Sequence, residues 1–218
     1  MTTAPAVPGL DVAELVATAR RLRADAVAAP ADADFAVHLD LAMTDAEFTG
    51  VLGEPFDAAG HWRRAVEALR TADMVGPWLY RGAAQVGWVG LRLGRTPPAA
   101  VDQLLVAWVD GYPRDCELDL PRGLLGIGVY ALAHPDRPLA DRLTPAILDV
   151  LADRASGPHG LAPRSLMAGG ARLVGLAHGA AGLVAYLAAV ARSGLPVAGR
   201  AAPLLDAALA WLLRCRRP

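Results

Sequence analysis

The stretch GLAHGAAG, residues 175–182, lies between a Gly- and Pro-rich segment and a run of apolar residues that reaches Val190. Its glycines allow a sharp turn or a close backbone approach, and the apolar run predicts a buried helix. His178 is the one titratable side chain in this small, apolar setting. The stretch is therefore either a glycine-packed helix start with a structural histidine or a site that presents an imidazole.

Two earlier stretches have the same form, LYRGAAQVG at residues 79–87 and DLPRGLLGIGVY at residues 119–130. Each consists of a polar approach and a glycine cluster, followed by an apolar helix and then a more polar, amphipathic helix. The glycine clusters therefore start successive units, and their spacing is close to that of helical-hairpin repeats. In the first unit Gln85 stands where the other two units have glycine.

Apolar spacing, N-cap residues and prolines predict helices over residues 11–29, 57–73, 82–94, 96–109, 123–133, 138–154, 179–192 and 200–215. The helix after Pro138 is expected to break and restart at Thr144-Pro145, because proline lacks the N–H group that a helix interior needs. No run reads as a strand, so the sequence predicts an all-α protein. Apolar helices that alternate with amphipathic ones indicate an inner and an outer ring, an α/α toroid with the polar approach residues at one rim.

The N-terminal quarter of the chain is expected to be different. Residues 1–56 are interpreted as a tail, one helix and an acidic connector, and residues 57–218 as the repeat domain. The acidic residues of the connector are scattered, which indicates a solvated face rather than a metal site; they are Asp32, Asp34, Asp40, Asp45, Glu47 and Glu54.

Composition excludes several classes of function. The chain is 54% hydrophobic and carries a formal net charge of −1, which argues against nucleic acid as a partner. All 21 basic residues are arginine, so chemistry that depends on a lysine is excluded. The two cysteines are far apart in sequence, which gives no disulfide framework. The first residues show no basic-then-apolar signal pattern. No uncharged apolar run approaches the ~20 residues of a membrane helix. We therefore expect a cytoplasmic protein that binds neither nucleic acid nor membranes.

The glycine motifs resemble those of a known family. Residues 175–182 match the pattern G-x-A-H-G-x-x-G and residues 119–130 match D-x-x-x-G-x-x-G-I-G-x-Y, two motifs of the lanthionine synthetase C-like (LanC-like) lanthipeptide cyclases. The chain is similar to the N-terminal half of this family over roughly residues 57–218. The resemblance implies an α/α toroid, as an incomplete ring in this chain, and a precursor peptide as substrate. Family members add a cysteine thiol of the peptide to dehydroalanine or dehydrobutyrine, a lyase-type formation of a C–S bond that gives a thioether ring.

The resemblance also implies roles for residues of this chain. By their positions in the two motifs, His178 and Asp119 are the acid/base candidates, and proton transfer is what the enolate formed in this reaction requires. The approach residues Arg122, Tyr80 and Arg81 are expected to bind substrate. Arg122 either pairs with the Asp119 carboxylate or lies in solvent, and the sequence leaves both alternatives open.

The chain lacks the zinc-ligand motifs of this family. In the family a zinc held by two Cys and one His activates the thiol, and its motifs, G-x-C-Y-G and a later Cys-His-Gly, are absent here. Cys116, Cys215 and a histidine such as His159 lack the close ligand spacings typical of structural zinc sites. We therefore expect no metal site in this chain, and zinc only where a partner or a missing half supplies the ligands.

Three hypotheses follow. The chain is a truncated or split cyclase, completed by a second polypeptide or by a homo-oligomer, because half a toroid exposes two apolar flanks. Alternatively, it is a non-catalytic peptide-binding or scaffold subunit of a peptide-modifying complex. The third hypothesis, an unrelated toroid enzyme that acts on carbohydrates, needs two opposed carboxylates. Only Asp119 stands out, so this hypothesis ranks last.

Overall fold

A computed structural model describes residues 11–28, 34–72, 75–113, 117–156, 161 and 174–215. These residues form nine α-helices and no strand: α1 (Val12–Val27), α2 (Phe35–Leu52), α3 (Ala58–Thr71), α4 (Ala83–Arg92), α5 (Ala99–Asp110), α6 (Leu124–Ala133), α7 (Arg137–Ala155), α8 (Ala180–Arg192) and α9 (Ala198–Arg214). The expected all-α fold is confirmed. No helix in this part of the chain is long and apolar enough to cross a membrane.

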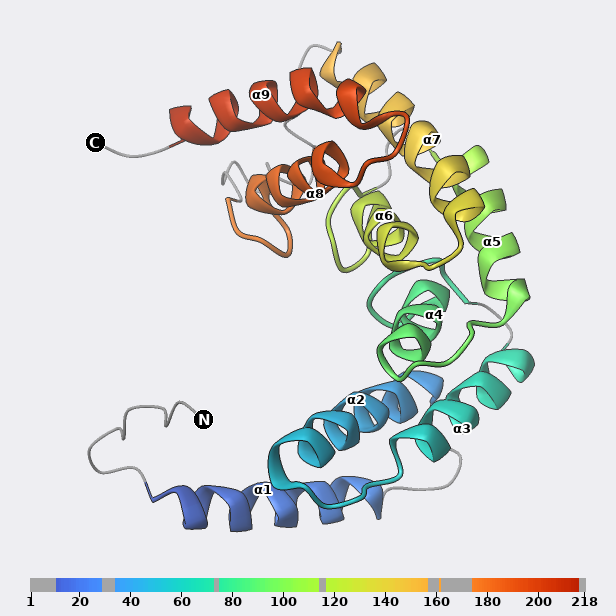
Figure 1. Ribbon diagram of the computed structural model, residues 1–218, viewed down its shortest axis with the longest axis vertical. Helices are drawn as coiled ribbons and strands as arrows, with labels where there is room; N and C mark the ends of the chain where they lie inside the picture. Colours follow the sequence, from blue (N-terminus) through green and yellow to red (C-terminus); the bar gives the residue numbers. More distant parts are fainter. Residues whose placement is uncertain are drawn as a thin grey trace.

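The helices form an arc of two layers (Figure 1). Consecutive helices pair as α2–α3, α4–α5, α6–α7 and α8–α9. The first helix of each pair lies on the concave side, where α2, α4, α6 and α8 pack in series, while α5, α7 and α9 pack in series outside them. This arrangement confirms the predicted inner and outer layers of an α/α toroid, and the described helices form an open arc.

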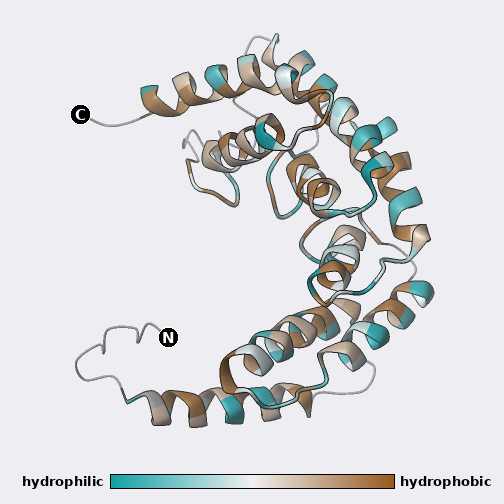
Figure 2. Ribbon diagram, in the orientation of Figure 1, coloured by the Kyte–Doolittle hydropathy of each residue, from teal (hydrophilic) through white to brown (hydrophobic). Residues whose placement is uncertain are grey.

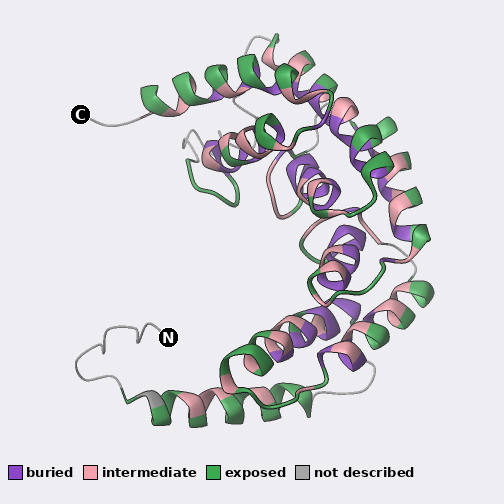
Figure 3. Ribbon diagram, viewed as in Figure 1, coloured by how far each residue is buried: buried purple, intermediate pink, exposed green. Residues whose placement is uncertain are grey.

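Burial follows the two layers. Seven of the ten residues of α6 are buried, and α4 is buried to a similar extent (Figure 3). The outer helices α5 and α7 bury one stripe each, and most of their hydrophilic residues lie outside that stripe (Figure 2). α6 is apolar all round because it has neighbours on several sides, whereas an outer helix needs only one apolar face.

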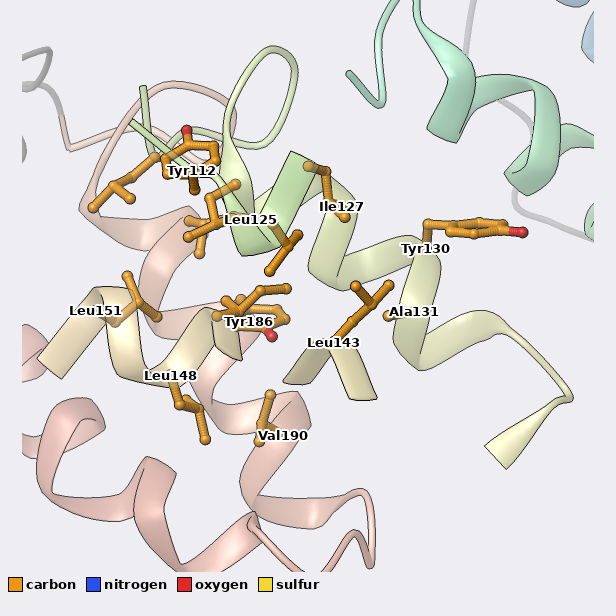
Figure 4. Close-up of a cluster of buried hydrophobic side chains, with 14 of the residues drawn as sticks. Tyr112, Leu125, Ile127, Tyr130, Ala131, Leu143, Leu148, Leu151, Tyr186 and Val190 are labelled. Atoms are coloured by element: carbon orange, nitrogen blue, oxygen red, sulfur yellow. The ribbon is translucent and has the colours of Figure 1, made fainter. Parts of the chain in front are cut away.

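Tyr130 and Tyr186 pack between successive inner helices, and both lie in the core drawn in Figure 4. A Cβ added at Gly87 of α4 would come within 2.5 Å of the Tyr130 ring of α6, and one at Gly128 of α6 within 2.4 Å of the Tyr186 ring of α8. Each ring therefore fills the space that the absent side chain leaves on the preceding inner helix. The repeat in sequence thus becomes a repeated Gly–Tyr contact.

The stretch expected as an acidic connector contains α2, a helix that the sequence analysis did not assign. Asp45 of α2, interpreted as part of a solvated face, is 0% exposed. Its carboxylate accepts hydrogen bonds from Nε and Nη2 of Arg23 on α1, the second at 2.8 Å, and Nε2 of His61 on α3 lies 3.7 Å away. The interpretation was wrong for Asp45 because its partner comes from another helix, far away in sequence.

His61 also contacts a second buried histidine, His38 of α2. The rings of His38 and His61 lie 5.9 Å apart, and the Nδ1 atoms of both are buried without a hydrogen-bond partner in the described structure. Burial is the main cause that lowers the pKa of each imidazole below its ordinary value, and the Arg64 guanidinium lowers both pKa values further. The junction of α1, α2 and α3 therefore favours neutral histidines.

Two expected helix boundaries are corrected. α7 continues through Pro145 as one helix, where a break was expected, and α5 begins after Pro98 rather than at Thr96. Proline in a helix interior costs ~3 kcal/mol. Leu143 and Ile147 flank Pro145 and are buried in the core, and this packing offsets the lost backbone hydrogen bond. Tertiary contacts outweigh local propensity at this point.

Candidate functional site

The candidate site lies at the N-terminal ends of α4, α6 and α8. A glycine with extended backbone caps each helix: Gly82, Gly123 and Gly179. A Cβ on Gly123 would lie 2.3 Å from the backbone N of Asp119, so no larger residue fits there without a shift of the turn. The glycine clusters bring each approach segment tightly over the start of its helix.

The three approach segments are joined by main-chain hydrogen bonds. The N–H of Tyr80 donates to the carbonyl of Pro121 at 2.8 Å, and the N–H of Leu120 donates to the carbonyl of Ala177 at 3.0 Å. Segments about 40 and 60 residues apart in sequence are therefore side by side at one rim of the inner layer. We call the hollow that they line the rim pocket; its volume is about 850 Å³, and its lining residues are Leu79, Tyr80, Glu117, Asp119, Leu120, Pro121, Arg122 and His178.

Asp119 and His178 are in contact in this pocket. Nδ1 of His178 lies 2.7 Å from Oδ2 of Asp119, and Oδ1 of Asp119 accepts a hydrogen bond of 2.8 Å from the backbone N–H of Arg122. The carboxylate is 9% exposed and the imidazole 60% exposed. Because a carboxylate only accepts, Nδ1 carries the hydrogen and Nε2 is left free to exchange a proton with a ligand.

The expected substrate-binding residues are only partly brought together. Tyr80 and Arg122 line the rim pocket, whereas Arg81 is not among its lining residues. The Arg81 guanidinium lies over the Tyr80 ring, 5.8 Å from its centroid. Of the two alternatives for Arg122, the structure favours the second, because its side chain is exposed. Arg122 contacts Asp119 through its backbone N–H and not through its guanidinium.

The sequence analysis missed the partners of Gln85. Its Oε1 accepts from the backbone N–H of Arg81 at 2.7 Å, and its Nε2 donates to Oδ1 of Asp40 on α2 at 3.3 Å. Arg81 has a φ of 59°, a left-handed conformation that is uncommon outside glycine, and the Gln85 amide holds its N–H there. The sequence signal is the substitution itself, because Gln85 stands where the other units have Gly126 and Gly182. Those glycines have no room for a side chain, so the first unit must differ at this point.

The described residues do not fit the zinc of the LanC-like family. No group of three or more His, Cys, Asp and Glu side chains in this part of the chain is arranged to hold a metal ion. Cys215 caps the C-terminus of α9, and Cys116 and His159 lie outside the described residues. We therefore derive no step of the chemistry through zinc.

The arc is similar to a solved structure. It matches "Nisin cyclase" with a TM-score of 0.67 at 17% sequence identity, covering 90% of this chain and 57% of that chain. The fold is that of a LanC-like α/α toroid. The match spans little more than half of nisin cyclase, and at this identity it shows the fold alone. No protein-family model matches the sequence, and no curated protein matches it.

Proposed function

We propose that this LanC-like chain binds a dehydrated precursor peptide and promotes addition of a cysteine thiol to dehydroalanine or dehydrobutyrine. The observation that carries the proposal is the exposed imidazole of His178, backed at 2.7 Å by the nearly buried carboxylate of Asp119 on an open pocket. A positioned imidazole with a free Nε2 is suited to general acid–base work. The fold shared with nisin cyclase supports a peptide as the ligand.

In the proposed reaction His178 moves one proton. Nε2 takes the proton of the peptide thiol while the sulfur bonds to the Cβ atom of the dehydro residue, and the π electrons pass to an enolate. The imidazolium then returns a proton to Cα, so the addition is complete with no group released. Asp119 holds the ring in the required tautomer and stabilises the imidazolium between the two transfers.

The other pocket residues suit binding of a peptide. Leu79, Leu120 and Pro121 form an apolar wall against which a dehydro side chain packs. The exposed Arg122 has donors for a peptide carbonyl, which becomes the enolate oxygen during the addition. Tyr80 contributes an aromatic face at the edge of the pocket, with the Arg81 guanidinium over it.

The experiment measures loss of free thiol in a peptide that carries one dehydroalanine and one cysteine. Remaining thiol is alkylated with N-ethylmaleimide, and the products are resolved by mass spectrometry with and without added ZnCl₂. We expect cyclisation with the native chain and its loss in Asp119→Asn and His178→Asn. Asp141→Asn, an exposed carboxylate on α7, is the matched control. Equal rates in all variants would contradict the proposal.

The alternative function is peptide binding without chemistry. It is supported by the apolar wall and the exposed donors of the rim pocket, which need no proton transfer to hold a peptide. Binding of the same peptide is measured by fluorescence anisotropy, with His178→Ala and Asp119→Ala as variants. Binding that survives both changes, together with no thiol loss in the native chain, would favour the alternative.

The proposal extends to association with a second polypeptide or a second copy. Leu15 and Leu22 on α1 and Leu213 on α9 are exposed at the two ends of the arc. Exposed apolar groups of this kind favour burial against another surface. Light scattering coupled to gel filtration distinguishes a self-associated species from a monomer, and a monomer at all concentrations would exclude self-association.

A further inference from the structure

A second pocket lies at the opposite ends of the inner helices, away from the rim pocket. It is lined by the α4–α5 connection, the first turn of α5 and the α6–α7 connection, and its volume is about 620 Å³. We call it the connector pocket. Its polar lining residues include Arg95, Asp102, His134 and Asp136, and its apolar walls include Leu91 and Pro135.

Asp102 is the carboxylate that this pocket presents. Its Oδ1 accepts a hydrogen bond of 2.5 Å from the hydroxyl of Tyr130, whose ring is fully buried. Burial and the Asp102 carboxylate both raise the pKa of Tyr130 far above its ordinary value, so the hydroxyl stays a donor. No donor among the described residues lies within hydrogen-bonding distance of Oδ2, and the side chain is 26% exposed.

His134 lies behind the carboxylate. Its side chain is 7% exposed, and its Nδ1 accepts from the backbone N–H of Asp136 at 3.0 Å. Its Nε2 is buried and has no hydrogen-bond partner among the residues that the structure describes. Because Nδ1 accepts, the proton of the neutral ring is on Nε2, which faces Oδ2 of Asp102 at 3.7 Å, beyond hydrogen-bonding range. The pocket thus has a buried donor and an accessible acceptor whose pairing is incomplete.

A comparison with the next repeat shows that Asp102 and His134 are not needed for the Gly–Tyr contact. Tyr186 fills the same kind of glycine gap on α6 that Tyr130 fills on α4, and its hydroxyl has no hydrogen-bond partner in the described structure. The Gly–Tyr contact is therefore formed without an acid and a histidine next to the hydroxyl. Packing alone does not require Asp102 and His134.

The surroundings of Asp102 favour a cation. Asp136 adds a second negative charge to the lining. α4 and α6 end at this pocket, whereas α5 and α7 begin there, so the partial charges of the helix ends oppose one another and the two carboxylates set the sign. Among the described lining residues, Arg95 is the one with a permanent positive charge. The apolar walls suit an aliphatic chain that leads to the charged group.

We propose that the connector pocket binds a guanidinium or ammonium group carried on an aliphatic chain, with Asp102 as its acceptor. Two sources have this chemistry: an arginine or lysine side chain of a peptide, and a free small amine. The proposal concerns a site separate from the rim pocket and does not depend on thioether formation.

The test is an NMR titration of the full chain at constant ionic strength. The probes are the peptide Ac-Ala-Arg-Ala-NH₂, its citrulline analogue, which has the same shape without the charge, and agmatine. We expect shifts at the amides of Gly94, Arg95, Ala133, His134 and Asp136 with the arginine peptide, and affinity about tenfold weaker with citrulline. Tighter binding of the arginine peptide than of agmatine assigns a peptide side chain, and the reverse assigns a free amine.

Variants make the test specific for the charge. Asp102→Asn keeps an oxygen that accepts from Tyr130 but loses the charge, and we expect it to weaken binding about tenfold. Arg95→Gln removes the competing cation at an exposed position, and we expect binding to tighten about two- to fivefold. Equal affinity for citrulline, unchanged affinity in Asp102→Asn, or shifts confined to the rim pocket would each overturn the proposal.

Discussion

Two aspartate–histidine pairs lie near opposite ends of α6, and each exposes the partner that the other buries. At the rim pocket the imidazole of His178 is 60% exposed and the carboxylate of Asp119 is 9% exposed. At the connector pocket the imidazole of His134 is 7% exposed and the carboxylate of Asp102 is 26% exposed. The same two residue types therefore present an imidazole at one end and a carboxylate at the other. What a pair can do depends on which member reaches the ligand.

The largest expected effect separates the two histidines. We expect His178→Ala to lower the rate of thioether formation about 10²- to 10⁴-fold, the usual contribution of general acid–base catalysis, with little change in melting temperature. His134→Ala leaves a cavity around a buried ring, so we expect it to lower the melting temperature. Peptide mass spectrometry and differential scanning fluorimetry give the two readouts. A larger loss of stability in His178→Ala than in His134→Ala would contradict the comparison.

The next effect concerns the hydroxyl that holds Asp102. Tyr130→Phe removes a hydrogen bond to a carboxylate, and we expect it to lower the free energy of unfolding by about 1.5–3 kcal/mol. Tyr186→Phe is the matched control, because the Tyr186 hydroxyl is buried with no partner in the described part of the chain, and its removal should be neutral or stabilising. Chemical denaturation measures both. Equal losses would show that the Tyr130 hydroxyl is not what stabilises the connector end.

A change in the middle of α6 tests the packing that lies between the two pairs. The Cβ of Gly128→Ala would meet the Tyr186 ring at 2.4 Å, and we expect overpacking to cost about 1–3 kcal/mol. Gly50→Ala in α2 is the control: nothing lies within 4 Å of its Cβ, so the higher helix propensity of alanine should stabilise the chain by up to about 1 kcal/mol. A stabilised Gly128→Ala would mean that the ring moves aside at no cost.

The smallest effect uses pH to test buried histidines outside the two pairs. The pKa values of His38 and His61 are lowered, chiefly by burial, so the unfolded chain binds protons first as the pH falls through about 6.5. Their contribution to stability is therefore present above that pH and is lost below it, down to the folded pKa values. Urea denaturation between pH 7.5 and 5 measures the loss. A His38→Gln/His61→Gln variant should show a shallower pH dependence, and an equally steep one would assign the effect elsewhere.

The sequence predicted what depends on local pattern. The glycine clusters at Gly82, Gly123 and Gly179 correctly marked the starts of α4, α6 and α8. At Gly82 and Gly123 a Cβ would meet the backbone of the approach segment at 2.5 Å or less, so glycine is required there. The motif positions also named Asp119 and His178, which lie in contact, although their catalytic roles stay a prediction.

What the sequence missed depends on partners that are distant along the chain. Asp45 appeared solvated because nothing nearby in sequence shows that Arg23 bonds to it from another helix. The Tyr130–Asp102 contact and its neighbour His134 likewise join α5 to α6 through packing, with no motif to mark them. α7 runs through Pro145 because the buried residues around it outweigh a local signal.

The main-chain bonds between the approach segments have a consequence for how this site can evolve. Peptide groups make those bonds, and every residue except proline carries both a donor and an acceptor. The position before the capping glycine, occupied by Arg122 and His178 in two of the repeats, can therefore change its side chain while the rim keeps its shape. A single substitution there is enough to exchange an imidazole for a guanidinium, so the chemical group that the rim presents can change without a new fold.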